Sequence, residues 1–229
     1  MFFDSYYFLL VVPAILVALY AQVRVQSTFR RYASVPTQNR LTGAEAARRV
    51  LAAGGVTDVP IERVRGSLTD HYDPRGNVIR LSESVYGSAT VAAVGVAAHE
   101  AGHALQYAEG YRPILVRNTI IPVANIGSQL SFFLIIVGLL LNFEPLFLAG
   151  ILCFTLLVAA QLVTLPVEFN ASKRAVAALY DGSLLTDEEL DGADRVLRAA
   201  ALTYVAALLV SIAQLLRFIL IFAGGRRRN

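Results

Sequence analysis

The chain has 229 residues, of which 56% are hydrophobic and only 16% are charged. Its mean hydropathy of +0.56 lies well on the apolar side of the mixture that is usual in soluble globular domains. The basic residues are nearly all arginine, and their distribution is typical of loops beside membrane spans, not of a nucleic-acid-binding face. With Cys153 as the only cysteine, a disulfide-stapled secreted fold is excluded. We therefore expect a lipid bilayer, and no nucleic acid, among the partners of this chain.

A first apolar run covers residues 6–23 and is followed by Arg24, Arg30 and Arg31. A cleaved signal peptide would carry its positive charges before the apolar run and would end in a small-residue cleavage site, and neither feature is present. The pattern predicts an uncleaved transmembrane anchor over residues 1–23. Because arginine accumulates on the cytoplasmic side of spans, we expect the N-terminus outside and the following residues inside the cell.

Residues 24–117 are mixed in character, and two helices are predicted in them. Thr42 and Glu45 have the spacing of a capping box, and the glycine pair at 54–55 ends the short helix that begins there. An Ala/Val-rich stretch predicts a longer helix over residues 88–109. Its purely apolar part is too short to cross a bilayer, so it is expected to be a buried core helix.

A small β element is predicted between these helices. Residues 61–66 and 78–81 alternate between apolar and polar in the manner of strands. The sequence Asp-Pro-Arg-Gly-Asn at 73–77 supplies turn-forming residues between them. A small sheet or a hairpin is therefore expected.

Two further apolar runs, at 119–141 and 146–165, are each long enough to cross roughly 30 Å of hydrocarbon. Only residues 142–145 join them, so residues 118–165 are predicted to form a transmembrane hairpin. The residues before and after such a hairpin lie on the same side of the membrane.

The remainder of the chain is predicted as a polar segment over 166–200 and a final membrane helix with a basic tail over 201–229. Thr186, followed by acidic residues, is typical of a helix start. The last apolar run covers 202–222 and ends in the arginines at 226–228, whose side of the membrane the pattern leaves open.

Residues 99–103 match the HExxH pattern of zinc peptidases. At about 3.6 residues per helical turn, His99 and His103 share one helix face, where two imidazoles can bind one Zn²⁺ ion. Glu100 is rotated off that face and is better placed to take a proton from a zinc-activated water than to bind the metal. The alternative, that these are structural core histidines, is disfavoured because a buried ionisable cluster is costly unless it is paired or metal-bound.

Two other segments accompany the motif helix AAVGVAAHEAGHALQ at 92–106, namely TDHYDP at 69–74 and LPVEFNAS at 165–172. Together these segments strongly resemble the YugP-like membrane zinc metallopeptidases of bacteria, and the resemblance runs from the N-terminal anchor to about residue 180. The chain is more distantly similar to the HtpX and CAAX prenyl protease group, whose members also interrupt the site with membrane spans. The resemblance implies a zincin-like peptidase unit with two zinc histidines, a glutamate base and a third, glutamate ligand on a later helix.

Glu168 is the residue that matches this third ligand. The predicted hairpin gives a physical reason for its distance from His103 in the sequence, because both spans leave and return to the same membrane side. His71 is an alternative third ligand, but its turn-rich surroundings favour a surface histidine. Where the HtpX-like group has an aspartate four residues after its ligand glutamate, this chain has Ser172, a weaker partner for an imidazole.

Arg174 and Tyr180 follow Glu168 and are candidate transition-state stabilisers, since a nearby cation or hydroxyl can stabilise an oxyanion. For Arg174, a structural salt bridge is an equally good interpretation.

These observations predict a mainly α-helical integral membrane protein with a small β element, in which residues 24–117 and 166–200 form a zincin-like peptidase unit at the membrane surface. We expect a multi-pass protein of the bacterial inner membrane whose active site faces the cytoplasm. It would be a membrane-embedded, zinc-dependent endopeptidase that uses a zinc-activated water to hydrolyse peptide bonds, and its protein or peptide substrates would be membrane or membrane-proximal proteins. The alternative is a non-hydrolytic scaffold or chaperone with a structural zinc, although structural zinc sites usually have four protein ligands and need no base.

Overall fold

The structure is a computed structural model that describes residues 4–226. The first three residues of the predicted anchor and residues 227–229 of the predicted basic tail lie outside the described residues. The chain divides into two compact units. The membrane unit comprises Met1–Gln22, Leu115–Leu165 and Thr203–Asn229, and the site unit comprises Val23–Ile114 and Pro166–Leu202.

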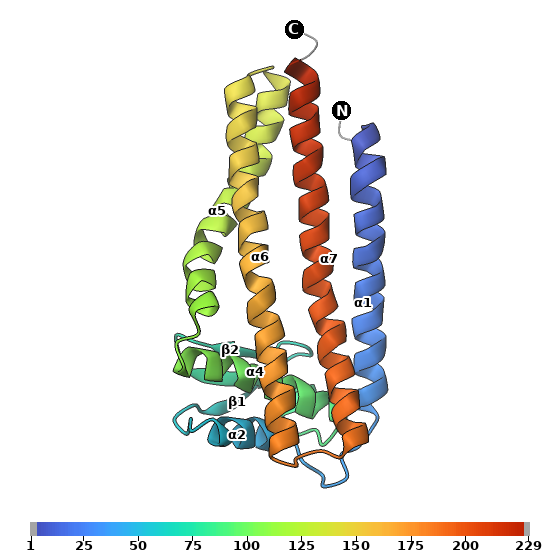
Figure 1. The fold of residues 1–229 in the computed structure, drawn as a ribbon, viewed down its shortest axis with the longest axis vertical. Helices are drawn as coiled ribbons and strands as arrows, with labels where there is room; N and C mark the ends of the chain where they lie inside the picture. Colours follow the sequence, from blue (N-terminus) through green and yellow to red (C-terminus); the bar gives the residue numbers. More distant parts are fainter. Residues whose placement is uncertain (1–3, 227–229) are drawn as a thin grey trace. The chain divides into compact units, whose positions relative to one another are not determined.

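Four helical segments in the described part of the chain are long and apolar enough to cross a membrane. The most apolar window of each has a mean hydropathy between 2.0 and 2.5, and at most 28% of any window is buried within the protein. Long apolar helices whose side chains face outward are typical of contact with lipid. These segments are the π-helical turn Tyr7–Val11 with α1 (Val12–Ala33), α5 (Arg112–Leu140), α6 (Glu144–Asp181) and α7 (Asp187–Arg226) (Figure 1).

Within the membrane unit, α5 and α6 form the predicted hairpin (Figure 1). Glycines allow their backbones to approach closely. A Cβ atom added at Gly138 would lie 2.6 Å from the backbone nitrogen of Phe147, and one at Gly150 would lie 3.0 Å from the backbone nitrogen of Ile135. Small residues at such contacts favour helix association in membranes, because packing replaces the hydrophobic driving force that lipid removes.

Both α6 and α7 extend beyond the apolar runs that the sequence shows. α6 continues through Pro166 to Asp181, and α7 is one helix from Asp187 onward, so much of the predicted polar segment 166–200 is helical. Proline commonly ends a helix because it lacks an N–H donor, but the loss of one hydrogen bond does not end this one. A side chain that follows the apolar run of α6 is therefore carried by a helix and not by a loop.

The site unit contains the predicted short helix and the HExxH helix. The capping box at Thr42 and Glu45 is confirmed, since each side chain accepts a hydrogen bond from the other residue's backbone N–H. Apart from its parts of α1, α5, α6 and α7, the unit consists of α2 (Gly43–Ala53), β1 (Ile61–Val64), β2 (His71–Asp73), β3 (Val78–Ser82), α3 (Glu83–Tyr86) and α4 (Val91–Ala108).

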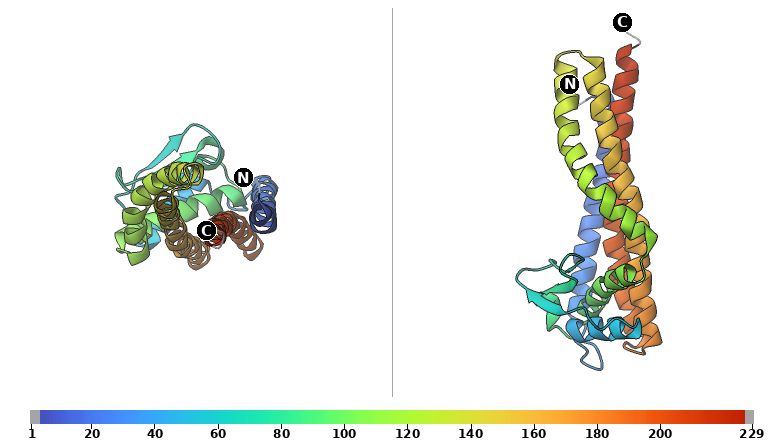
Figure 2. Two further views of the ribbon diagram at one scale, coloured as in Figure 1. Left: turned by 90° about the horizontal axis from the view of Figure 1, so that it is seen from above. Right: turned by 90° about the vertical axis from the view of Figure 1, so that its left-hand side faces the viewer.

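The three strands form one sheet in the order β1-β3-β2. β1 pairs with β3 in parallel, with Ile61 opposite Ile79, whereas β2 pairs with β3 antiparallel, with Tyr72 opposite Ile79. The two predicted strands therefore do not form a hairpin with each other, and β3 forms its hairpin with β2. A strand of three residues is too short for a periodic pattern to reveal it. In Figure 2 the sheet lies along one edge of the site unit, with β2 as an edge strand.

These elements confirm a mainly α-helical membrane protein with a small β element. In the site unit the core is built around α4, whose Ala and Val side chains are buried on almost every side. A helix that is apolar all round is typical of a buried position. Gly102 lies where α4 meets α6, and a Cβ atom there would be 2.6 Å from the carbonyl oxygen of Ala171.

Replacing Gly102 by alanine is expected to lower the thermal unfolding temperature of the purified protein. Alanine favours helices by roughly 1 kcal/mol over glycine, but overpacking against the Ala171 backbone should cost about 1–3 kcal/mol. Gly87→Ala is the matched control, because a Cβ atom at Gly87 meets nothing within 4 Å. An unchanged or raised unfolding temperature for Gly102→Ala would contradict this account of the helix contact.

Candidate metal centre

The HExxH residues lie in the second half of α4. Thr90 caps this helix by accepting a hydrogen bond from the N–H of Ala93, and the alanine-rich sequence that follows has high helix propensity. His99 and His103 are one turn apart on the same face, with ring centroids 4.7 Å apart and an interplanar angle of 83°. Their Nε2 atoms are thereby directed to one region beside α6.

Glu168, carried by α6, completes a group of three side chains that could hold a metal ion. Its Oε2 atom lies 3.3 Å from Nε2 of His99 and 3.5 Å from Nε2 of His103. Two atoms that each lie about 2.0–2.1 Å from a tetrahedral zinc ion are about 3.3–3.4 Å apart. Two imidazole nitrogens and one carboxylate oxygen are also a donor set that zinc accepts, so the chemistry and the two nitrogen–oxygen distances fit this ion.

The three side chains are largely shielded from solvent, with exposed fractions of 16% for His99, 11% for His103 and 3% for Glu168. Burial by itself would lower the pKa of His103, because it disfavours the charged imidazolium. The hydrogen bond to Glu168 and the charges of Glu100 and Glu168 outweigh burial and raise the pKa of His103 above its ordinary value. The site therefore favours a positive charge next to the buried carboxylate.

Glu100 lies outside the group of three clustered side chains. It is buried, and its Oε2 atom accepts a hydrogen bond of 3.0 Å from the backbone N–H of Tyr72 in β2. In an antiparallel pair, backbone N–H groups point alternately toward the partner strand and away from it. The N–H of Tyr72 points away from β3, so the edge of the sheet and the HExxH helix meet at this carboxylate.

Other candidates from the sequence lie elsewhere. His71 is exposed on β2, and its Nδ1 atom is 2.8 Å from the carbonyl oxygen of Thr69. Tyr180 is 64% exposed, and twelve helical residues after Glu168 correspond to about 18 Å along α6. Neither residue is a member of the clustered group in the described part of the chain.

The guanidinium of Arg174 is held by hydrogen bonds to two other side chains. Its Nε atom donates to Asn170 at 2.7 Å, and its Nη1 atom donates to Glu109 at 2.5 Å. The latter contact lowers the pKa of the Glu109 carboxyl. The salt bridge that the sequence offered as one interpretation of Arg174 is thus present.

Two residues contact the ring nitrogens that face away from the metal cluster. The Oγ atom of Ser172 lies 3.1 Å from Nδ1 of His99, in the position expected of a partner for a ligating imidazole. Gln106, which sequence reasoning missed, places Oε1 3.0 Å from Nδ1 of His103. The sequence signal that could have indicated this contact is the spacing of Gln106 from His103, since residues three apart share a helix face.

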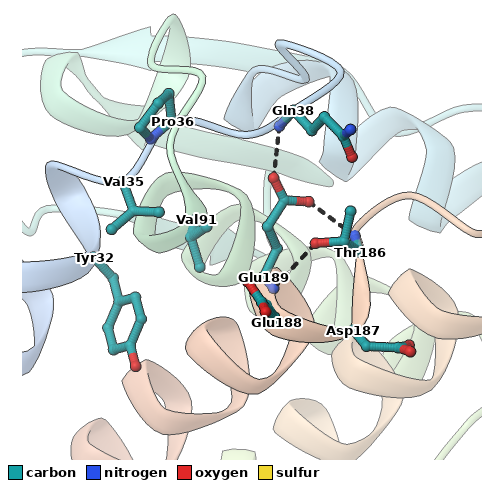
Figure 3. Close-up of a pocket in the computed structure, with 9 residues that line it drawn as sticks. All are labelled: Tyr32, Val35, Pro36, Gln38, Val91, Thr186, Asp187, Glu188 and Glu189. Atoms are coloured by element: carbon teal, nitrogen blue, oxygen red, sulfur yellow. Dashed lines mark hydrogen bonds between the residues drawn. The ribbon is translucent and has the colours of Figure 1, made fainter.

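A separate cavity of about 830 Å³ lies in the site unit at the start of α7 (Figure 3). Its acidic residue Glu189 accepts hydrogen bonds from the N–H groups of Gln38 and Thr186, and its own N–H donates to the Thr186 hydroxyl. This capping box confirms the predicted helix start at Thr186. None of the residues around the cavity belongs to the metal cluster; they are Tyr32, Val35, Pro36, Gln38, Val91, Thr186, Asp187, Glu188 and Glu189.

Comparison with known proteins supports the chemistry of the metal cluster. The family described as "Putative neutral zinc metallopeptidase" matches residues 7–223 of this chain. The chain is also 47% identical over 220 residues to "Putative membrane protease YugP" of Bacillus subtilis (strain 168), in an alignment that covers 96% of this chain and 98% of that protein. No solved structure matches the chain.

These matches confirm the resemblance drawn from the sequence segments and identify zinc as the metal that the family uses. Together with the four apolar helices, they support a membrane protein with a zinc-dependent hydrolase site.

Replacing Glu168 by glutamine is expected to weaken zinc binding by more than about 100-fold. Loss of a hydrogen bond to a metal ligand already weakens metal binding by roughly 10–100-fold, and Glu168 is expected to be a ligand itself. The amide has the shape of the carboxylate but lacks the negative charge that lies between the two imidazoles. Zinc content and chelator competition measure the effect on purified protein. His71→Ala is the control and should leave zinc affinity unchanged; the reverse pattern would make His71 the third ligand.

Proposed function

The chain belongs to the neutral zinc metallopeptidase family, and we propose that it is a membrane-embedded, zinc-dependent endopeptidase. The observation that carries this proposal is the convergence of His99, His103 and Glu168, in which the two nitrogen–oxygen distances suit ligands of a tetrahedral zinc ion. Three protein ligands leave one coordination position open, as catalytic sites require and structural zinc sites usually do not.

In this proposal, His99 and His103 would hold zinc through Nε2, and Glu168 would hold it through a carboxylate oxygen. When bound, zinc supplies Lewis acidity, which polarises a peptide carbonyl and lowers the pKa of a water molecule. The three side chains carry one negative charge between them, so a site holding a divalent cation would keep a net positive charge that favours an electron-rich carbonyl oxygen.

Glu100 is the proposed general base. Its Oε2 atom accepts a hydrogen bond from the N–H of Tyr72, which restrains the carboxylate, and its other oxygen would accept a proton from the attacking water. The same residue can then deliver the proton to the leaving amine, because the proton stays on a carboxylic acid beside the site. The role requires a carboxylate that does not bind the metal, and Glu100 lies outside the clustered group.

We further propose that substrate binds as an extended strand along β2. This strand is at the edge of the sheet, and the backbone of Tyr72 faces the HExxH helix and not β3. Peptides commonly add to such edges through main-chain hydrogen bonds, which accept many sequences. Membrane proteins or membrane-proximal segments are the proposed substrates, because the enzyme itself carries four apolar helices.

Arg174 and Tyr180 remain candidate transition-state stabilisers. The hydrogen bonds of Arg174 to Asn170 and Glu109 favour a structural role for its guanidinium, whereas the exposed Tyr180 lies far along α6 from Glu168. A role in stabilising the oxyanion would require either side chain to move toward the substrate.

The proposed location is the bacterial inner membrane with the site unit in the cytoplasm. Arg24, Arg30 and Arg31 follow the apolar part of the first span, as cytoplasmic arginines do. Within the membrane unit, Arg217 of α7 forms an ion pair of 2.7 Å with Asp4, which precedes the first span. This contact favours a C-terminal end on the same, external side as the N-terminus.

Replacing Glu100 by glutamine is expected to leave zinc bound but to lower the rate of hydrolysis by about 10²–10⁴-fold, because the amide cannot accept a proton. Cleavage of unfolded casein and of a membrane protein, each measured beside zinc content, tests this outcome. Near-normal hydrolysis by the variant would remove Glu100 from the mechanism. If zinc-loaded wild-type protein cleaved no substrate, the alternative of a scaffold or chaperone with structural zinc would be favoured.

Cysteine labelling in intact cells tests the orientation. On a Cys153→Ala background, a cysteine at residue 60 should resist a membrane-impermeant thiol reagent, because the arginine distribution predicts a cytoplasmic site unit. A cysteine at residue 228 should react, because the ion pair with Asp4 places Arg217 of α7 beside the segment that precedes the first span. Labelling after permeabilisation provides the control for each site. External labelling at residue 60 would overturn the orientation.

A further inference from the structure

Gln106 has the environment of a residue that positions a metal ligand. It lies on α4 three residues after His103, and its side chain is completely buried. Its Nε2 atom donates to the carbonyl oxygen of Val167 at 2.9 Å and to Oδ1 of Asn170 at 2.9 Å. Its Oε1 atom lies 3.0 Å from Nδ1 of His103.

These contacts determine which way the amide of Gln106 faces. The backbone carbonyl of Val167 is an acceptor in every protonation state, so the atom that faces it has to be the NH₂ group. Oε1 of Gln106 therefore faces His103, and it can only accept a hydrogen bond. Nδ1 of His103 must then carry a proton and donate it.

The tautomer of His103 follows from this contact. A neutral imidazole that is protonated at Nδ1 has its lone pair on Nε2, and Nε2 is the atom that faces Glu168 at 3.5 Å. Oε1 of Gln106, by accepting from Nδ1, thus leaves the lone pair of Nε2 available to bind a metal ion. Because the amide also bonds to the residue before Glu168, it joins the HExxH helix to the helix that carries the third clustered side chain.

We propose that Gln106 is a positioning residue that holds His103 in its zinc-binding tautomer, and that Asn170 and Arg174 hold Gln106 in turn. Oδ1 of Asn170 accepts from both Gln106 and Arg174, and Arg174 is anchored by Glu109. This chain of hydrogen bonds gives Arg174 a positioning role that does not involve stabilising the transition state. The proposal rests on the proposed function, since it takes zinc as the ion that His103 binds.

His99 provides an internal comparison. Its Nδ1 atom faces the hydroxyl of Ser172 at 3.1 Å, and a hydroxyl can either donate or accept. Ser172 therefore does not impose a tautomer on His99. Loss of Gln106 should weaken zinc binding more than loss of Ser172.

Zinc affinity of the purified full-length protein tests the proposal. Gln106→Met removes the acceptor while preserving the side-chain volume, and it should weaken zinc binding about 10–100-fold. Gln106→Glu retains an acceptor for His103 but loses the NH₂ group that donates to Val167 and Asn170, so its zinc affinity should lie between those of wild type and Gln106→Met. Gln161→Met makes the same chemical change seven residues before Glu168 on α6 and should leave zinc affinity unchanged.

A second pair of variants tests the outer part of the hydrogen-bond chain. Asn170→Asp keeps an oxygen that accepts from Gln106 and Arg174, whereas Asn170→Leu removes it. Zinc affinity should be retained in the first variant and reduced in the second, by less than in Gln106→Met because Val167 still orients the amide. Equal affinity in both Asn170 variants and wild type would remove Asn170 and Arg174 from the proposal.

Nuclear magnetic resonance can detect the proton on Nδ1 of His103, and loss of a purely structural residue would not change its exchange. The chain has three histidines, so zinc-loaded protein with isotope-labelled histidine gives a small set of ring-nitrogen signals. His103 should show a protonated, slowly exchanging Nδ1 in wild type and lose that protection in Gln106→Met. The inference is overturned if Gln106→Met binds zinc as wild type does and keeps the protected Nδ1 proton.

The same measurements separate this inference from the proposed function. If Glu168→Gln and His99→Ala bind zinc as tightly as wild type, the metal site itself is misplaced. If those variants lose zinc while Gln106→Met does not, only the positioning role fails. Thermal unfolding of the metal-free variants identifies any that do not fold. If Gln106→Met or Asn170→Leu does not fold, the zinc affinities of Gln106→Glu and Asn170→Asp are compared with that of wild type instead.

Discussion

The carboxylate of Glu168 lies between two imidazole rings in a place where its side chain is only 3% exposed, and much of the site unit depends on this contact. Burying an uncompensated carboxylate costs several kcal/mol, and neutral imidazoles do not supply the missing charge. A bound cation would supply that positive charge, so the burial of this glutamate is consistent with a metal ion at the cluster. The raised pKa of His103 reflects the same demand for positive charge.

Close packing of two helices makes the contact possible. The carbonyl of Ala171 approaches α4 at a position where only glycine fits, and Gln106 bridges from α4 to the carbonyl of Val167. These two contacts lie on either side of Glu168 in the sequence. Glu168 therefore lies on a helix segment that is fixed on both sides. Small changes in this packing would alter the position of its carboxylate relative to His99 and His103.

The edge of the sheet provides a further constraint on the site. The backbone of Tyr72 holds Glu100, so the proposed base is positioned by main chain and not by another flexible side chain. The edge strand that would receive substrate and the carboxylate that would activate water are joined by one hydrogen bond. In the proposed mechanism, substrate alignment and proton transfer would thus be linked through the short strand β2, whose other edge is paired with β3.

Much of this organisation is visible in the sequence. Periodicity and length predicted the membrane helices and the buried helix over 88–109, because lipid and a protein core both demand long apolar stretches. Local rules predicted the caps at Thr42 and Thr186. The HExxH spacing itself placed His99 and His103 on one face, since that relation is a property of any α-helix.

Tertiary structure decided what such local rules do not contain. The parallel pairing of β1 with β3 and the contact of Gln106 with Val167 each join residues that are well separated in the chain. The continuation of α6 through Pro166 was likewise not predicted from the sequence. The meeting of Glu168 with the two histidines was expected from a resemblance and a hairpin, but its distances required the folded molecule. Helical periodicity relates residues within one turn or two, whereas the approach of two helices is determined by the side chains that they bury against each other.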